Sequence, residues 1–179
     1  GNPLSLKSVI TFNAALACAI AYFSPTAYAF TSEHIQKLKL SKSCTACDLS
    51  QSLLSGTDLN NSNVFGSNLA AANLEKTNLQ SSILTSTNLA DARLSGANLQ
   101  SADLSKANLS GAELAGANLL AANLSDAVLY KANLTDVNLV SANLSGTNLA
   151  RANLSGANLY GIIFSRTNLT EANIAAANL

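Results

Sequence analysis

The sequence predicts an all-β solenoid in which the chain winds into four-sided coils of twenty residues. The first observation is a period of five, because a large apolar residue stands at every fifth position from Leu49 to Leu179 without an insertion. The second is composition, since Leu, Ala and Asn make up 84 of the 179 residues. Such a bias is typical of an internal repeat. Charged residues account for only 11% of the chain, under half of the share of about 25% in ordinary globular proteins.

The five-residue period excludes both an α-helix and a straight strand. On a helix, every fifth side chain is rotated by roughly 140°, so the apolar residues would be spread around the axis. On a straight strand, side chains alternate with a period of two, and successive leucines would lie on opposite faces. The backbone must therefore bend once in every unit, and four bends close a square coil. Neighbouring coils are then expected about 4.8 Å apart, with residues i and i+20 in register.

The 27 units share a pattern around the central apolar residue. The residue two positions before the centre is Ala, Thr or Ser in 24 units, and we expect it to point inward beside the centre. The residue directly before the centre is Asn or Asp in 21 units. We expect it at the bends, because these side chains bond to their own backbone. The register also predicts that residues twenty apart lie directly above one another. Three opposite-sign pairs have that spacing, namely Arg93–Glu113, Lys106–Asp126 and Arg151–Glu171, whereas Lys131–Arg151 is a like-charged pair.

This A-(N/D)-L-x-x motif, repeated in tandem over about three quarters of the chain, resembles the pentapeptide repeat family. The resemblance implies that residues 44–179 form a right-handed quadrilateral parallel β-helix. Members of this family are common in cyanobacteria, and most have no known function. The resemblance therefore implies an architecture more directly than it implies a role.

Residues 1–29 have the composition of a secretory signal peptide. Lys7 supplies a short positive region, residues 9–23 are apolar, and residues 27–29 read A-Y-A, with small residues at the usual cleavage spacing. We expect cleavage before Phe30, and the first two residues are interpreted as a tag remnant. An uncleaved anchor or an additional amphipathic helix is the alternative, although the apolar stretch is short for a membrane span. Export would place the protein in a periplasm or thylakoid lumen, without membrane attachment after cleavage.

Residues 30–43 are predicted to form a short helical cap. Thr31 or Ser32 can cap the start of this helix, and Ile35 and Leu38 fall on one of its faces. An open end of a β-helix exposes unpaired backbone groups. We therefore expect the helix to cover the first coil.

Cys44 and Cys47 form a C-x-x-C motif directly before the first unit, and three interpretations stay open. A disulfide could staple the cap, two buried thiols could pack, or the pair could be redox-active, since the motif lowers thiol pKa values. An oxidising compartment would permit the disulfide. A zinc site would need two more ligands, and His34 is the only histidine. The longer motif C-x-x-C-D-L resembles a recurrent start of the repeats in cyanobacterial relatives, which implies a structural role.

The residues of the repeat region favour a protein without enzymatic activity. The region contains no histidine, so its many serines lack an obvious base. A phosphate-binding G-x-x-x-x-G-K-S/T loop does not occur in the sequence. The carboxylates are scattered over different columns of the predicted coil, as with Asp91, Asp103, Glu113 and Asp126. We therefore expect no catalytic residues, no cofactor and no metal.

The charge of the chain argues against a nucleic-acid partner. The whole chain is neutral, whereas nucleic-acid binders carry a basic stripe. The family resemblance implies an alternative function, since acidic members mimic DNA and inhibit DNA gyrase. Residues 48–179 carry a net charge of only −3. That is small for imitating a backbone with one charge per about 1.7 Å.

One column of side chains spaced by twenty residues predicts a contact with another protein. The column is polar in the early coils and apolar in the late ones, in the order Asn60, Gln80, Gln100, Leu120, Val140 and Tyr160. Exposed apolar patches often mark partner sites. The candidate contact residues are therefore Leu120, Val140 and Tyr160, with Ile163 round the next corner, and tolerated variation is the alternative. We expect a protein-interaction or structural scaffold with a protein partner of unknown identity. Relatives that dimerise end to end also imply a homodimer through the C-terminal coil.

Overall fold

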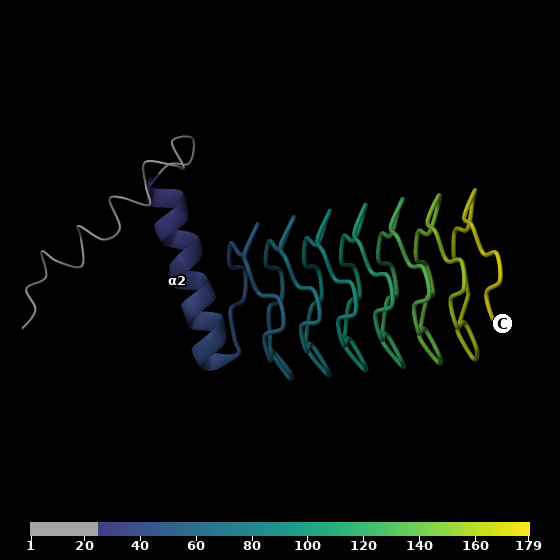
Figure 1. The fold of residues 1–179 in the computed structure, drawn as a ribbon, viewed down its shortest axis with the longest axis horizontal. Helices are drawn as coiled ribbons and strands as arrows, with labels where there is room; N and C mark the ends of the chain where they lie inside the picture. The colour runs from purple at the N-terminus through teal and green to yellow at the C-terminus, as the bar shows by residue number, and fades with distance from the viewer. Residues whose placement is uncertain (1–24) are drawn as a thin grey trace, which may run out of the picture.

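The computed structural model describes residues 25–179, which form one helix followed by a solenoid (Figure 1). Helix α2 spans Pro25–Ser41, and the chain winds into stacked coils from Ser43 onward. The C-terminus lies at the end of the solenoid opposite α2 (Figure 1). Most of the predicted signal peptide, residues 1–24, lies outside the described residues.

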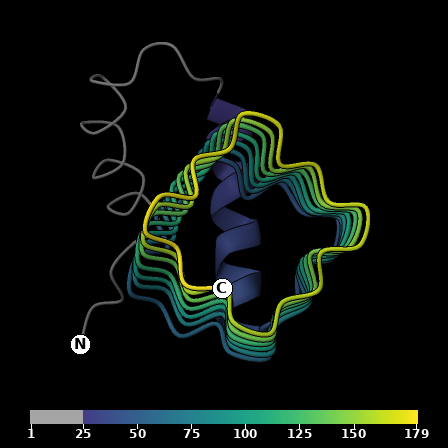
Figure 2. The same cartoon turned by 90° about the vertical axis from the view of Figure 1, so that its right-hand side faces the viewer.

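Each coil contains twenty residues, as the period predicts. A parallel bridge joins each unit to the unit twenty residues later, from Ser43↔Asn63 to Asn158↔Asn178. Two backbone hydrogen bonds flank each bridge. At the bridge Arg93↔Glu113, for example, the N–H of Leu94 donates to the C=O of Glu113 at 2.7 Å, and the N–H of Glu113 donates to the C=O twenty-one residues earlier at 2.9 Å. The view along the axis shows a four-sided outline (Figure 2), so the predicted parallel, four-sided coil is confirmed.

The bends lie at a different position of the unit from the one we predicted. The second residue after each centre has a φ between 51° and 70° at all 27 positions from Ala46 to Ala176. The Asn or Asp before the centre lies instead on the straight side, at the bridge, so its predicted place at the bend was wrong. Its side chain does bond to nearby backbone, since Asn98 Oδ1 accepts the N–H of Gln100 at 3.2 Å. The bend itself needs a left-handed backbone, which most residue types adopt here at a modest cost.

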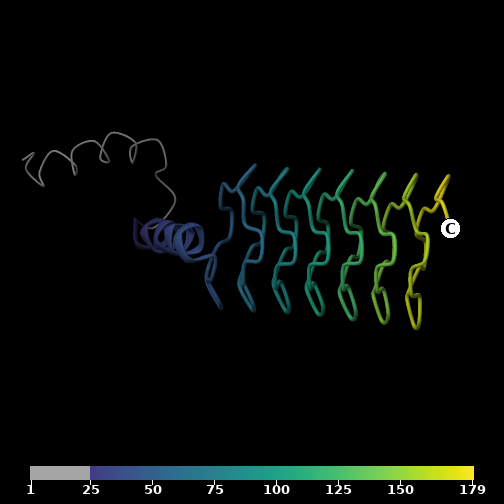
Figure 3. The same cartoon turned by 90° about the horizontal axis from the view of Figure 1, so that it is seen from below.

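The interior is filled by two inward positions on each side of the coil. The centres from Leu49 to Leu159 are at most 4% exposed, and the small residues two positions earlier, such as Ala92 and Ala112, are also buried. Burial of one leucine side chain contributes about 1.5–3 kcal/mol. Seen from below, the coils form a regular stack (Figure 3). Each coil therefore depends mainly on its two neighbours, as in other solenoids.

Five hydroxyl side chains at the small inward position, those of Ser67, Thr77, Ser82, Thr147 and Thr167, donate to the C=O of the centre 23 residues earlier. Thr87 donates instead to Leu84, and Ser62 donates to Ser82 Oγ. Thr77 Oγ1 donates to the C=O of Leu54 at 2.7 Å, and Thr147 Oγ1 donates to that of Leu124 at 2.8 Å. Ser52 does not form this bond, because the residue 23 positions earlier lies in α2. Its Oγ is buried and has no hydrogen-bond partner among the described residues.

Helix α2 begins earlier than the sequence predicts. It starts at Pro25, so Thr31 and Ser32 lie inside the helix and do not cap its N-terminus. Proline is favoured in the first turn of a helix, because its φ is fixed near the helical value and its missing N–H is not needed there. The predicted cleavage point before Phe30 also falls within α2.

The predicted apolar face of α2 meets the core of the solenoid. Leu38 is buried with the first coil, and Ile35 is partly buried against the same core. The helix lies across the N-terminal end of the stack (Figures 1 and 2). It ends where Lys42 takes a left-handed φ of 53°, and the N–H of Lys42 donates to the C=O of Leu38 at 2.8 Å. Over residues 25–179, α2 included, no helix has the length and apolar character to cross a bilayer.

We predict that Ser52→Ala stabilises the protein and that Thr77→Ala destabilises it. Removal of an unpaired buried hydroxyl relieves a desolvation penalty of about 1–3 kcal/mol, whereas Thr77 loses a hydrogen bond of about 0.5–1.5 kcal/mol together with a buried methyl group. Urea unfolding of both variants measures the two free-energy changes. A loss of stability in Ser52→Ala equal to that in Thr77→Ala would contradict this difference between the two hydroxyls.

Candidate interaction surface and disulfide corner

The register brings the predicted contact residues Leu120, Val140 and Tyr160 into one column. The N–H of Ala121 donates to the C=O of Val140 at 2.8 Å, and the N–H of Ser141 donates to that of Tyr160 at 2.9 Å. These bonds place the three side chains at the same corner of successive coils. Tyr160 is 66% exposed, whereas Leu120 and Val140 are partly exposed.

This corner carries no charged residue throughout the repeat region, residues 43–179, all of which the structure describes. We call it the uncharged corner and define it as residues 60–61, 80–81, 100–101, 120–121, 140–141 and 160–161. The other three corners carry Glu75, Lys76, Asp91, Lys106, Asp126, Lys131, Asp136, Arg151, Arg166 and Glu171. Sequence reasoning found the apolar column but missed the absence of charge, although the twenty-residue spacing was sufficient to show it.

The sides next to the uncharged corner are polar but almost without charge. The preceding side carries an asparagine ladder in which the amide of Asn118 donates to Asn98 Oδ1 at 3.4 Å and that of Asn138 donates to Asn118 Oδ1 at 3.1 Å. The following side carries Ile163, which is 51% exposed and bridged to Asn143. The apolar column is thus flanked by neutral amides and by one further exposed apolar residue.

Of the three opposite-sign pairs with the twenty-residue spacing, Arg151–Glu171 forms an ion pair. Arg151 Nε lies 2.5 Å from Glu171 Oε2, and this hydrogen bond raises the pKa of Arg151. The guanidinium also donates to Tyr130 Oη at 3.4 Å, and Lys131 Nζ lies 5.3 Å from the centroid of the Tyr130 ring. All of these groups are on the surface, where an ion pair contributes little stability.

The other two opposite-sign pairs are stacked as predicted but do not form ion pairs. Arg93 bonds to Glu75 at 2.6 Å and not to Glu113. The long guanidinium side chain reaches a carboxylate on the preceding coil, so the vertical register alone does not select its partner. Lys106 and Asp126 form no ion pair among the described residues, although they occupy the same column.

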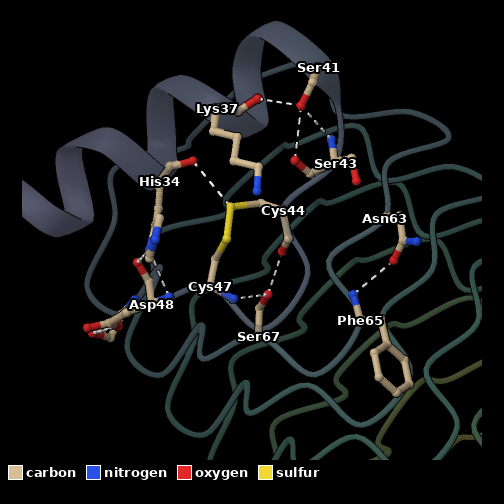
Figure 4. Close-up of a disulfide and its surroundings, with 11 residues drawn as sticks. His34, Lys37, Ser41, Ser43, Cys44, Cys47, Asp48, Asn63, Phe65 and Ser67 are labelled. Carbon is tan, nitrogen blue, oxygen red and sulfur yellow. Dashed lines mark hydrogen bonds between the residues drawn. A yellow bond between two sulfur atoms is a disulfide. The ribbon is translucent and has the colours of Figure 1, made fainter.

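Cys44 and Cys47 are joined by a disulfide at the N-terminal end of the solenoid (Figure 4). Their Cα atoms are 5.6 Å apart, and the two residues are 0% and 4% exposed. Cys44 occupies the position of a centre, five residues before Leu49, and Cys47 occupies the small inward position. The bridge Ser43↔Asn63 shows that this extra unit belongs to the solenoid. The sequence reasoning did not recognise it, because its centre is not a large aliphatic residue.

Helix α2 contacts this disulfide corner through His34 (Figure 4). The carbonyl oxygen of His34 lies 3.6 Å from Cys44 Sγ, and His34 Nδ1 lies 3.0 Å from the backbone nitrogen of Asp48. Within residues 25–179, no three His, Cys, Asp or Glu side chains gather into a group that could hold a metal ion. The disulfide therefore closes a corner of the first coil, and α2 touches that corner through non-covalent contacts.

Asp103 has the most strongly hydrogen-bonded carboxylate on the sides of the solenoid. Partial burial acts to raise its pKa, but hydrogen bonds from the hydroxyl and backbone N–H of Ser105 and from Thr85 and Asn123 together hold the pKa below its usual value. The Ser105 hydroxyl lies 2.6 Å from Asp103 Oδ1. The native state therefore favours the ionised carboxylate.

The stacked five-residue units, the buried leucine columns and the side-chain ladders define a β-solenoid of the repeat-protein class. The chain belongs to the pentapeptide repeat family, because the profile described as "Pentapeptide repeats (8 copies)" matches residues 43–80, 72–111, 107–146 and 147–179. Proteins of this family form right-handed quadrilateral β-helices and are generally structural or binding proteins. No curated protein sequence matches the chain.

Solved structures with the same fold come from several sources. HetL, a pentapeptide repeat protein involved in heterocyst differentiation regulation from Nostoc sp. strain PCC 7120, is 27% identical with a TM-score of 0.42, over 76% of this chain and 82% of HetL. Trypsin-treated QnrB1, a plasmid-mediated fluoroquinolone resistance protein, is 21% identical with a TM-score of 0.58, over 76% of this chain and 79% of QnrB1. A pentapeptide repeat protein from the Arabidopsis thaliana thylakoid lumen is 29% identical with a TM-score of 0.30, over 55% and 65% of the two chains. The similarity to trypsin-treated QnrB1 supports the fold alone.

We predict that the stability advantage of the wild type over Asp103→Asn decreases as the pH falls. Because the folded pKa of Asp103 is lowered, its contribution is fully present above the unfolded value of about 4 and is lost as the pH falls through the folded value. Urea unfolding of both proteins between pH 7 and pH 2 measures the difference. A difference that does not change with pH would show that the hydrogen bonds do not favour the ionised form.

Proposed function

We propose that the protein is a non-catalytic scaffold that binds another protein through the uncharged corner. The observation that carries this proposal is the apolar column Leu120, Val140 and Tyr160 on the corner that lacks charge over every coil. The centres of protein interfaces are depleted in charged residues and enriched in aromatic ones. Tyr160 and Ile163 supply exposed apolar area, and the neighbouring asparagine ladder supplies neutral hydrogen-bonding groups at the rim.

We also propose that the scaffold works outside the cytosol, in a periplasm or thylakoid lumen. The signal-peptide composition of residues 1–29 supports export. The Cys44–Cys47 disulfide supports it independently, because disulfides persist mainly in oxidising compartments.

The distribution of charge disfavours the alternative of DNA mimicry. A mimic needs a dense row of negative charge to match the phosphate backbone. Here the acidic residues of the repeat region are divided among several columns, and basic residues stand in the same columns, as Lys131 and Arg151 do beside Asp91 and Glu171. We therefore do not propose gyrase as a partner.

A homodimer through the C-terminal coil is the second contact that we propose. The centres of this coil are exposed, at 39% for Phe164, 36% for Leu169, 47% for Ile174 and 73% for Leu179. Together with the leucines of the coil before, they line an apolar depression. A second copy placed end to end would cover these side chains, since the same apolar surface would be present on both partners.

We predict that a photo-crosslinking side chain at Val140 captures a specific protein partner in cells and that one at Ala150 does not. Ala150 occupies the same place in its unit but lies on a charged corner, next to Arg151. Tyr160→Asp should weaken the interaction by about 10- to 100-fold, because burial of an unpaired carboxylate costs a few kcal/mol. Mass spectrometry identifies the adducts. Equal adducts from both positions, or none from Val140, would indicate that the apolar column is only tolerated variation.

We predict that the purified protein is a dimer and that Ile174→Lys converts it to a monomer. A buried lysine without a partner opposes association, whereas Thr170→Lys places the same charge on the outer surface of the same coil and should leave the dimer intact. Light scattering over a range of protein concentrations measures the mass. A monomeric wild type, or a dimer that survives Ile174→Lys, would reject this contact.

A further inference from the structure

We propose that the Cys44–Cys47 disulfide is a redox-sensitive latch, so that its reduction by a dithiol releases helix α2 from the first coil. The proposal concerns the N-terminal end of the solenoid and is independent of the uncharged corner. It rests on the hydrogen bonding of the disulfide corner, on the contacts of α2 with that corner and on the burial of both sulfur atoms.

The disulfide corner lacks the backbone hydrogen bond that closes the other corners. At each later corner of the described solenoid, the small inward residue donates its N–H to the C=O of the centre three residues earlier, as Ala97 does to Leu94 at 3.0 Å. At the disulfide corner, the N–H of Cys47 donates instead to Ser67 Oγ at 3.0 Å, and the Ser67 hydroxyl donates to the C=O of Cys44 at 2.6 Å (Figure 4). The covalent bond therefore replaces a direct backbone link, and without it only the inserted hydroxyl bridges the turn.

Cys44 and Asp48, which lie at the two ends of this turn, are also residues that α2 contacts. His34 contacts Cys44 Sγ through its carbonyl oxygen and the backbone of Asp48 through Nδ1, with distances of 3.6 Å and 3.0 Å. Leu38, one turn further along the helix, is buried in the same apolar cluster as Cys44 and Cys47. A turn that becomes less restrained between Cys44 and Asp48 would therefore loosen the hydrogen bond that the Asp48 N–H donates to His34 Nδ1.

Burial makes the redox state and the position of α2 depend on each other. A thiolate must approach a disulfide sulfur directly, but Cys44 is 0% exposed and Cys47 is 4% exposed. The sulfur atoms become accessible only when α2 moves away. A helix that covers the sulfur atoms therefore slows their reduction, and the weaker restraint of the turn after reduction in turn loosens the docking of the helix.

The chemical step is thiol–disulfide exchange with a dithiol reductant. One thiolate of the reductant attacks a protein sulfur, forms a mixed disulfide and expels the other protein sulfur as a thiolate. The second thiol of the reductant then closes its own disulfide and expels the remaining protein thiolate. Two electrons pass from the reductant to the protein, and both cysteines take up a proton to become thiols.

Hydrogen exchange of the α2 amides, measured with and without dithiothreitol, tests the proposal. The full chain carries Cys18→Ser, so that Cys44 and Cys47 are the only cysteines of the protein. Alkylation of both thiols then confirms that reduction is complete. We expect the amides of residues 35–40 to exchange at least tenfold faster in the reduced protein. The amides of the central coils should keep their protection, which shows that the solenoid remains folded.

The double variant Cys44→Leu/Cys47→Ala is the matched control, because it places the ordinary centre and small residue of the repeat at this corner. Its α2 exchange should not respond to dithiothreitol. A response in this variant would overturn the proposal, and so would unchanged α2 exchange in the fully reduced protein.

The rate of reduction provides a second readout. Leu38→Ala, which weakens the docking of α2, should speed the reaction of the disulfide with dithiothreitol at least tenfold. An unchanged rate would show that the helix does not protect the sulfur atoms and would reject the latch.

Discussion

The parallel bridges between residues twenty apart depend on a left-handed backbone conformation at one residue in every five. That conformation, with φ between 51° and 70°, turns the chain at each corner and returns the next leucine to the interior. Leucine burial, the parallel bridges and the side-chain ladders all follow from the closed coil. Most corners are turned by Ala, Ser, Lys, Arg, Asp or Glu instead of glycine. The small strain at each corner must therefore be offset by the apolar core and the bridges of that coil.

The same register determines which residue fits at a corner, because each corner is stacked on another. Gly111, Gly146 and Gly156 each follow an aspartate twenty residues earlier, and the carboxylate of that aspartate occupies the space that a Cβ would need. Gly116 has no such neighbour within 4 Å. Glycine at these corners thus leaves room for the carboxylate of the preceding coil, which would have to shift if the residue carried a Cβ.

Prediction from sequence succeeded where one period fixed the geometry and failed where two interactions competed. The five-residue period was enough to predict the twenty-residue coil and the column of Leu120, Val140 and Tyr160. The position of the bend was wrong, because Asn98 and its equivalents bond both to nearby backbone and to the ladder, and composition does not reveal which bond determines their place. Arg93 pairs with Glu75 and not with Glu113, the residue stacked on it, because its long side chain reaches several carboxylates. Cys44 was not recognised as a centre of the five-residue pattern, because a disulfide-bonded cysteine stands there in place of a large aliphatic residue.

The disulfide corner and the apolar column of Leu120, Val140 and Tyr160 are separated along the solenoid axis by more than three coils. In a solenoid, each coil is stabilised mainly by its immediate neighbours, so a disturbance at one end decays along the stack. A change in the docking of α2 therefore has little means of altering the shape of the apolar column. If a partner spans only the later coils, redox state should leave its binding unchanged. If it also covers the first coil, the latch would control access to that part of the surface alone.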